Sequence, residues 1–418
     1  MKKLLGIILA TIMVVSVTAC GNDSISSSGN SAKETTTVAE TTVSTDKLAW
    51  ADYKVYNLDQ TSKVNNIILM IGDGMGENII KATEIVKGDK LVMSGMKNKT
   101  HVTTYSQSVK EGKEKFTDSA ASATALSTGT KTYNGCIGVD KDGNDLETIC
   151  EYAQKCGMKT GLVDRHYICH ATPAGMVAHN SFRGAYKAIL GEMVQSDVNV
   201  MLGGGSQYYT PSVQKKAESS GYKYITKESE LMNLTKKDDK VLGLFAYDNM
   251  KNPELSPSLV TQTSKALDLL ENDNGFFLMV EGSNIDVSEA ELNMDDTIKQ
   301  VEAFDQSVDY VLAWAEKHPG TLVLVTADHE TGGVKIPKNA TAKDINNDCF
   351  TSGGDHTNTN VLLMADGASS KEICKNKLID NTDIAKYMRK VLSYKLKWDW
   401  KKRKKWLYQT TLWFCYHM

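Results

Sequence analysis

The 418-residue chain lacks the patterns that mark several common kinds of site. It has eight cysteines, but no two of them are separated by only two residues, so the sequence does not indicate a zinc ribbon or a compact disulfide framework. The Gly-x-Ser-x-Gly pattern, which presents a serine nucleophile on a sharp turn, is absent, and no internal repeat is visible. A serine nucleophile in this chain would therefore need another means of activation, such as a metal.

The chain also lacks the excess of positive charge that binds a nucleic-acid backbone. Its net charge is −3, and residues 393–418 hold seven Lys or Arg and one Asp, which makes +6, so residues 1–392 carry −9. A body this acidic argues against nucleic-acid binding. The basic tail at 393–418 also holds four of the six tryptophans. We interpret it as an accidental extension, with contact to a membrane surface or wall polymer as the alternative.

Only one long apolar run is present, at residues 4–17, and Lys2 and Lys3 precede it. This arrangement is typical of a secretory signal. Small residues then lead directly to Cys20, as in a bacterial lipobox, where the cysteine is lipidated and becomes the mature N-terminus. The sequence thus predicts a lipoprotein signal peptide over residues 1–20 and an exported protein, anchored to the membrane through Cys20 at the cell surface or in the periplasm. An ordinary cleaved signal or an uncleaved anchor is the alternative.

Short apolar runs that alternate with helical patterns indicate the α/β fold class. The runs lie at residues 67–71, 276–280 and 322–325, with weaker ones at 199–202 and 361–364, and a helical pattern covers residues 295–318. The alternation predicts a largely parallel central sheet with helices on both faces, a three-layer sandwich. We assign this folded domain to residues 55–392. A flexible linker rich in Ser and Thr precedes it at residues 21–54.

Acidic and histidine residues follow the predicted strands at the points where the strands end. In an open sheet, sites form in the crevice beyond the carboxyl ends of the strands, so we expect these side chains to converge. They are Asp73, Glu281, Asp286, Asp328 and His329, with His356 as a further candidate just before an apolar run. Mixed Asp and His ligands suit Zn²⁺, whereas Asp, Glu and a hydroxyl suit Mg²⁺. The sequence therefore predicts a metal centre at this edge of the sheet.

A run of very small residues at 117–125 predicts a slim helix. Asp118 is a good N-cap, and the alanine-rich run after it favours helix. Ser119 would then lie in the first turn, where free main-chain N–H groups and the helix dipole favour an anion. The alternative is a helix whose residues are small only to allow close packing against a neighbour.

Together these segments resemble the bacterial alkaline phosphatase family. The matching segments occur in the family's order over roughly residues 60–370: 71–76, 117–123, 131–135, 170–174, 177–179, 202–205, 280–283, 326–329 and 356–357. The resemblance implies an alkaline-phosphatase-like fold and a phosphoric monoester hydrolase. It implies small-molecule phosphate monoesters as substrates, two Zn²⁺ ions and one Mg²⁺ ion as cofactors, and a homodimer as in many relatives.

The resemblance also implies roles for individual residues. Ser119 corresponds to the nucleophile that forms a phosphoserine, and Arg183 to the arginine that binds phosphate. Asp118 would orient Arg183, and His170 would lie near the water shell of the magnesium. The implied metal ligands are Asp73, Asp328 and His329 for the zinc at the serine oxygen, Asp286 and His356 for the other zinc, and Asp73, Thr172 and Glu281 for magnesium.

The family pattern breaks at position 290. Relatives have a histidine ligand four residues after the aspartate that corresponds to Asp286, but this chain has Ala290. Glu289 or Glu291 could supply an oxygen ligand instead, and carboxylates suit Mg²⁺ or Ca²⁺ better than imidazole does. The alternative is that both are solvated acids at the start of a helix.

The leading hypothesis is a metal-dependent phosphomonoesterase that acts through a phosphoserine at Ser119. One alternative is a phosphodiesterase of the same superfamily. Another is a phosphate-binding lipoprotein with weak catalysis, because the histidine expected at Ala290 is missing. Sulfatase relatives carry a Cys/Ser-x-Pro-x-Arg motif, and none of the six prolines here is followed by Arg two residues later, which argues against a sulfatase.

Overall fold

The computed structural model describes residues 54–396 of the chain. The predicted signal peptide, Cys20, nearly all of the linker, and residues 397–418 of the tail lie outside the described residues and stay predictions. The final helix, over residues 381–396, continues past the predicted domain end at residue 392. It is tied to the body there, because Tyr394 donates a hydrogen bond to the carbonyl of Val64 at 2.9 Å. Among the described residues, no helix is both long and apolar enough to cross a membrane.

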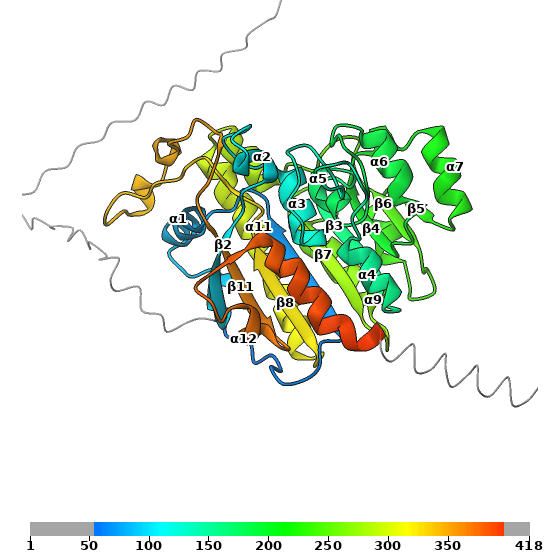
Figure 1. The fold of residues 1–418 in the computed structure, drawn as a ribbon. Helices are drawn as coiled ribbons and strands as arrows, with labels where there is room; N and C mark the ends of the chain where they lie inside the picture. Colours follow the sequence, from blue (N-terminus) through cyan, green and yellow to red (C-terminus); the bar gives the residue numbers. More distant parts are fainter. Residues whose placement is uncertain (1–53, 397–418) are drawn as a thin grey trace, which may run out of the picture. The chain divides into compact units, whose positions relative to one another are not determined.

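Within residues 54–396, ten strands form one sheet in the order β12-β2-β11-β8-β1-β7-β3-β4-β6-β5 (Figure 1). Their bounds are β1 Asn66–Gly72, β2 Asn98–Thr103, β3 Lys159–Tyr167, β4 Val200–Gly204, β5 Lys223–Ile225, β6 Val241–Leu244, β7 Phe276–Gly282, β8 Thr321–Thr326, β11 Val361–Gly367 and β12 Leu378–Asp380. All neighbours pair in parallel except β11, which runs antiparallel to β8 and β2. Two short strands, β9 Glu330–Thr331 and β10 His356–Thr357, form a separate antiparallel pair.

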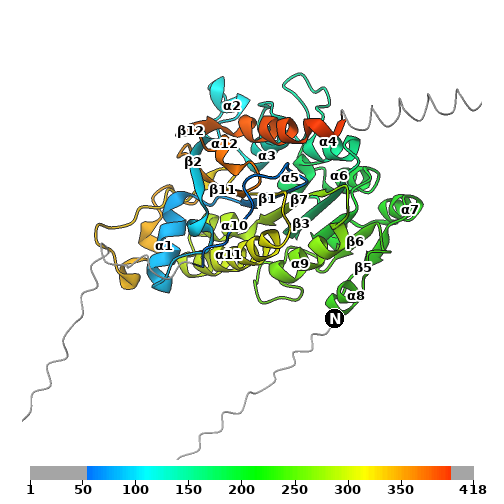
Figure 2. The same ribbon diagram turned by 90° about the horizontal axis from the view of Figure 1, so that it is seen from below.

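Helices cover both faces of the sheet. Figure 2 shows α9 and α11 on one side of the sheet and α4, α12 and the helix at 381–396 on the other. The helix bounds are α1 Glu77–Lys87, α2 Gln107–Lys110, α3 Ser119–Thr128, α4 Ile149–Lys155, α5 Ala171–Gly175, α6 Tyr186–Met193, α7 Pro211–Ser219, α8 Glu228–Met232, α9 Leu259–Leu270, α10 Asn284–Ala290, α11 Met294–Glu316 and α12 Ser370–Ile373. This arrangement confirms the predicted three-layer α/β fold.

The central strands are mostly apolar because helices bury both of their faces. Every residue of β1, β7 and β8 is buried, as expected for parallel strands in the middle of such a sheet. β1 lies between β7 and β8 and pairs in parallel with both. The carboxyl ends of these three strands therefore meet at one edge, and the chain that follows each strand brings its polar residues there.

Candidate active site and metal centre

Ser119 begins helix α3, and the local sequence fixes its position. Asp118 is the N-cap of this helix, since its Oδ1 accepts a hydrogen bond from the main-chain N–H of Ala121 at 3.0 Å. Ser119 is thus the first helical residue, where main-chain N–H groups lack partners within the helix and favour an anion. A side chain at Gly175 of α5 would come within 2.7 Å of Ala123 Cβ. The small residues therefore allow close packing against α5, and the anion site at the start of the helix stays a prediction.

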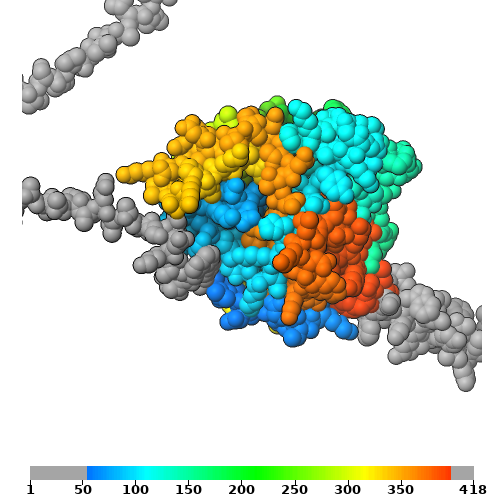
Figure 3. Space-filling view, turned by 60° about the vertical axis from the view of Figure 1, so that its left-hand side comes forward, coloured from blue at the N-terminus to red at the C-terminus, as the bar shows by residue number. Residues whose placement is uncertain are grey.

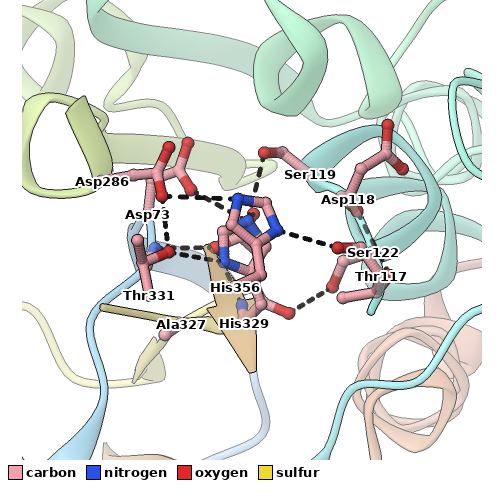
Figure 4. Close-up of polar contacts among 12 residues, drawn as sticks. Asp73, Thr117, Asp118, Ser119, Ser122, Asp286, Ala327, His329, Thr331 and His356 are labelled. Carbon is pink, nitrogen blue, oxygen red and sulfur yellow. Dashed lines mark hydrogen bonds and ion pairs between the residues drawn. The ribbon is translucent and has the colours of Figure 1, made fainter. Parts of the chain in front are cut away.

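The first cluster of metal-binding side chains lies beside Ser119 (Figure 4). Asp73 follows β1, and Asp328 and His329 follow the adjacent parallel strand β8. The three side chains are buried, and each offers one ligand atom within 4.8 Å of the others. His329 Nε2 lies 3.4 Å from Asp73 Oδ1, 3.2 Å from Asp328 Oδ2 and 3.3 Å from Ser119 Oγ. The serine hydroxyl therefore lies directly against this cluster.

A second cluster shares His329 with the first. Asp286, His329 and His356 offer ligand atoms within 4.8 Å of one another, and the rings of His329 and His356 stack with centroids 3.6 Å apart. His356 Nδ1 lies 2.8 Å from the carbonyl oxygen of Thr117, to which it donates, so Nε2 is left as the free ligand nitrogen. Thr331 donates from Oγ1 to Asp286 Oδ1 at 2.5 Å. No pattern in the sequence pointed to Thr331, which orients the aspartate.

Oxygen donors of a third group lie deeper in the molecule. Glu281 lies near the end of β7 and Thr172 in α5, and both are completely buried. Neither oxygen of Glu281, nor Thr172 Oγ1, nor Asp73 Oδ1 has a hydrogen-bond partner in the described part of the chain. A buried polar atom without a partner is costly, so this arrangement calls for a bound cation or water.

The donor sets of these groups fit metal cations. Burial raises the pKa of Asp73 well above its usual range, and the nearby carboxylates Asp328, Asp286 and Glu281 raise it further. Burial lowers the pKa of His329 to about 3, so its ring is neutral and able to bind a metal. A divalent cation would offset the buried negative charge. The two Asp/His clusters have the chemistry that Zn²⁺ prefers, and the all-oxygen group has that of Mg²⁺.

The guanidinium of Arg183 is held from two sides, by Asp118 and by His170. Its Nη1 donates to Asp118 Oδ2 at 3.0 Å, and its Nη2 lies 3.3 Å from His170 Nε2. Asp118 Oδ2 also accepts the main-chain N–H of Gly135 at 2.9 Å. Burial lowers the pKa of His170 well below its usual range, so this ring is neutral and accepts from the arginine. One carboxylate thus caps helix α3 and forms an ion pair with the guanidinium.

The residues around position 290 differ sharply in their surroundings. Ala290 is exposed at the end of α10. Glu289 is completely buried, both of its oxygens lack a hydrogen-bond partner among the described residues, and a side chain at Gly74 would meet its Oε2 at 2.6 Å. Glu291 is half exposed and forms an ion pair with Lys251. The structure therefore brings Glu289 to the acidic cluster and leaves Glu291 at the surface.

The chain matches the family model described as alkaline phosphatase over residues 64–351. It is 36% identical over 300 residues to alkaline phosphatase 4 of Bacillus subtilis, a match that covers 66% of this chain and 64% of the relative. It is also 30% identical over 413 residues to the alkaline phosphatase of Escherichia coli, a match that covers 79% of this chain and 86% of the relative. The chain spans only 64% and 63% of the lengths of two Bacillus subtilis relatives.

Solved structures show the same fold. A cold-active alkaline phosphatase from a Shewanella species superposes with a TM-score of 0.72 at 29% identity, covering 78% of this chain and 99% of the other. A mutant of the TAB5 alkaline phosphatase, with Mg bound in its M3 site, superposes with a TM-score of 0.72 at 32% identity. The match covers 80% of this chain and 99% of the other.

Proposed function

The chain belongs to the alkaline phosphatase family, and from this premise we propose that it is a metal-dependent phosphomonoesterase with Ser119 as its nucleophile. The observation that carries the proposal is the position of the Ser119 hydroxyl, 3.3 Å from His329 Nε2 and beside Asp73 and Asp328. A serine hydroxyl is a weak nucleophile unless a base or metal activates it. A metal ion held by the cluster at this hydroxyl would provide the activation that the serine needs.

Three sets of residues would hold the metals. Asp73, Asp328 and His329 would hold a zinc ion beside Ser119; Asp286, His356 and Glu289 a second ion; and Asp73, Thr172 and Glu281 a magnesium ion. When bound, these cations would favour the serine alkoxide and stabilise negative charge on the phosphoryl and leaving oxygens. Because Glu289 is a carboxylate in place of the family's histidine, we infer that the second site prefers a harder cation than its relatives do.

The residues of the chain itself would bind and orient the phosphate. Arg183 presents a planar fork of N–H groups that matches two phosphate oxygens. The free N–H groups at the start of α3 favour the same anion. Asp118 and His170 keep the guanidinium in place, so little reorganisation is needed when the substrate binds.

The proposed reaction has two displacements at phosphorus. In the first, a bond forms between Ser119 Oγ and phosphorus while the bond to the substrate's alcohol oxygen breaks, and the alcohol leaves with a proton. In the second, the oxygen of a water molecule attacks phosphorus, the bond to Oγ breaks, and the serine regains its proton. A cleft of about 640 Å³ beside His356, lined by residues 112–117 and 354–356, leaves room for the alcohol. On the face of the molecule that Figure 3 shows, cyan and orange parts of the chain lie side by side.

Comparison of two ester classes tests this function. The metal-loaded chain is expected to hydrolyse 4-nitrophenyl phosphate faster than bis(4-nitrophenyl) phosphate by at least about 100-fold in kcat/KM. The reason is that Arg183 and the helix terminus bind unsubstituted phosphate oxygens, of which a diester has fewer. A preference for the diester would identify the phosphodiesterase alternative, and turnover of neither ester would contradict the proposal.

Restoring a histidine at position 290 tests the second metal site. Ala290→His is expected to raise zinc affinity about 10-fold or more, because residue 290 lies one helical turn after Asp286 and imidazole is a good zinc ligand. Zinc retained against a competing chelator, together with turnover, is the measurement. Glu291→His is the matched control, since it adds a histidine to the same segment at the surface.

The same pair of variants addresses the phosphate-binding alternative. If the parent binds inorganic phosphate tightly with negligible hydrolysis and Ala290→His restores turnover, the chain is a binding protein with a weakened active site. If both histidine variants retain the same amount of zinc as the parent, position 290 does not face the metal and our account of this site is wrong.

A further inference from the structure

Asp164 is a buried carboxylate that neither the sequence analysis nor the proposed function uses. It lies on β3, directly after Val163, which pairs in parallel register with Val280 of β7. The pairing of β3 with β7 ends there, Asp164 and Glu281 are the residues that follow on the two strands, and their carboxyl groups interact with each other. Side chains in register on adjacent strands point to the same face of the sheet. Both carboxylates are completely buried.

One oxygen of Asp164 is satisfied and the other is not. Oδ1 accepts the main-chain N–H groups of Arg165 at 2.6 Å and His166 at 3.0 Å. Oδ2 has no hydrogen-bond partner among the described residues. The Asp164 carboxylate interacts with the side chains of Ser283 and Glu281, and Ser283 Oγ is likewise buried without a geometric hydrogen-bond partner among the described residues. The two main-chain donors fix the carboxylate so that Oδ2 is directed at this group of oxygens.

The neighbouring arginine does not satisfy the free oxygen. All five N–H groups of the Arg165 guanidinium donate to main-chain carbonyls of the loop that follows β6: those of Met250, Asn252, Leu255 and Pro257. The arginine is therefore fully engaged in holding that loop. Two adjacent carboxylates buried without hydrogen-bond donors for their free oxygens are strongly unfavourable unless a cation or a shared proton lies between them.

We propose that Asp164 is a further ligand, through Oδ2, of the divalent cation held by Thr172 and Glu281. The inference rests on the proposed metal-dependent function and adds a carboxylate to its all-oxygen site. Carboxylate and hydroxyl oxygens are the donors that Mg²⁺ prefers, and each added carboxylate strengthens the attraction for a small divalent cation. Asp164 thus makes this site more anionic and its hold on Mg²⁺ tighter than Asp73, Thr172 and Glu281 alone would.

Magnesium titration of the full chain tests the proposal. The metal-stripped protein is first saturated with zinc, and Mg²⁺ binding is then followed by calorimetry without substrate. Asp164→Asn, which keeps the shape of the side chain and removes its charge, is expected to weaken the Kd for Mg²⁺ by about 10- to 100-fold. Asp164→Ser, which keeps a small oxygen donor, is the second variant in case the first folds poorly, and it should weaken binding as well.

Asp305 provides a matched control. It is also a buried aspartate that accepts two main-chain N–H groups, those of Val92 and Met93, each at 2.9 Å, but it lies on α11. Asp305→Asn is expected to leave the Kd for Mg²⁺ unchanged. An unchanged or tighter Kd in the folded Asp164 variants would overturn the proposal, and tighter binding would indicate that Asp164 and Glu281 instead share a proton. Because the readout is Mg²⁺ binding, it is independent of whether the parent hydrolyses phosphate esters.

Discussion

Replacing Ser119 with alanine is expected to lower the turnover of phosphate monoesters by at least about 10³-fold, the scale seen when a covalent nucleophile is removed. The hydroxyl is the only part of this side chain that can accept a phosphoryl group, and it lies 3.3 Å from His329 Nε2. Alanine favours helix at this position, and the Asp118 cap does not involve the serine side chain. The Ser119→Ala protein should therefore fold and load metals like the parent.

Two measurements check this expectation. Initial rates with 4-nitrophenyl phosphate are compared at equal metal content, and labelled phosphate is trapped on the protein in mildly acidic buffer. The parent should carry the label on the peptide that contains Ser119, and the variant should carry none. Turnover of Ser119→Ala within tenfold of the parent would rule out the serine as nucleophile.

Ser127 offers a control on the same helix. It is completely buried, and its Oγ accepts the main-chain N–H of Ile149 at 3.4 Å. It has no part in the proposed chemistry, so Ser127→Ala should keep its turnover while losing about 1 kcal/mol of stability with that hydrogen bond. A comparable loss of activity in both variants would mean that helix α3 tolerates no change, and the nucleophile would then have to be identified from the trapped label.

The sequence was sufficient to predict the centre of the sheet but not its edges. β1, β7 and β8 each contain a continuous apolar run because both of their faces are covered, and such runs are visible in a sequence. β2 reads Asn-Lys-Thr-His-Val-Thr and shows no comparable run. It is a strand because it pairs with β11 on one side and β12 on the other. Pairing between distant segments is a tertiary effect that local pattern does not reveal.

The candidate site likewise contains residues that local sequence pattern predicts and residues that only tertiary pairing reveals. Asp73 and Asp328 could be predicted because each directly follows an apolar run. Asp164 could not, because it lies inside a strand, and only the register of β3 against β7 places it beside Glu281. Glu289 and Glu291 could be told apart partly from the helical period of the segment that holds them. At 100° per residue, Glu289 projects from α10 within about 60° of Asp286, whereas Glu291 projects about 140° away. Helical periodicity could therefore have favoured Glu289, although burial was needed to show it.

Removing the metals is expected to destabilise the protein strongly, by about 10 °C or more in Tm, because each tightly bound ion contributes roughly 4 kcal/mol at a thousand times its Kd. The buried acids then have no cation near them. Burial raises the pKa values of Asp73, Glu281 and Glu289 well above their usual range. In the metal-free fold these groups bind protons that the unfolded chain has already released.

The direction in which the stability of the metal-free protein changes with pH follows from this difference in proton binding between the folded and unfolded states. Where the folded state binds more protons than the unfolded state, stability falls as pH rises. Three neutral histidines act in the opposite direction: loss of solvation lowers the pKa to about 4 for His166, to about 3 for His329, and well below its usual range for His170. Their effect ends near pH 6.5, where an unfolded histidine loses its proton. Above that pH, the raised acids determine the trend of the metal-free protein.

We therefore expect the difference in Tm between metal-loaded and metal-free protein to widen from pH 6.5 to pH 8.5. Calorimetric scans of both forms at several pH values measure it. Taking the difference in Tm between the two forms removes the contribution of His179 to the pH dependence. Its pKa is raised to about 10 by hydrogen bonds to Glu151 and Glu192 in either form. Glu281→Gln removes one raised acid and should flatten the slope of the metal-free form. A gap that stays constant or narrows over this range would show that the buried acids do not form the metal sites, since bound metal keeps its ligands deprotonated at every pH in the range.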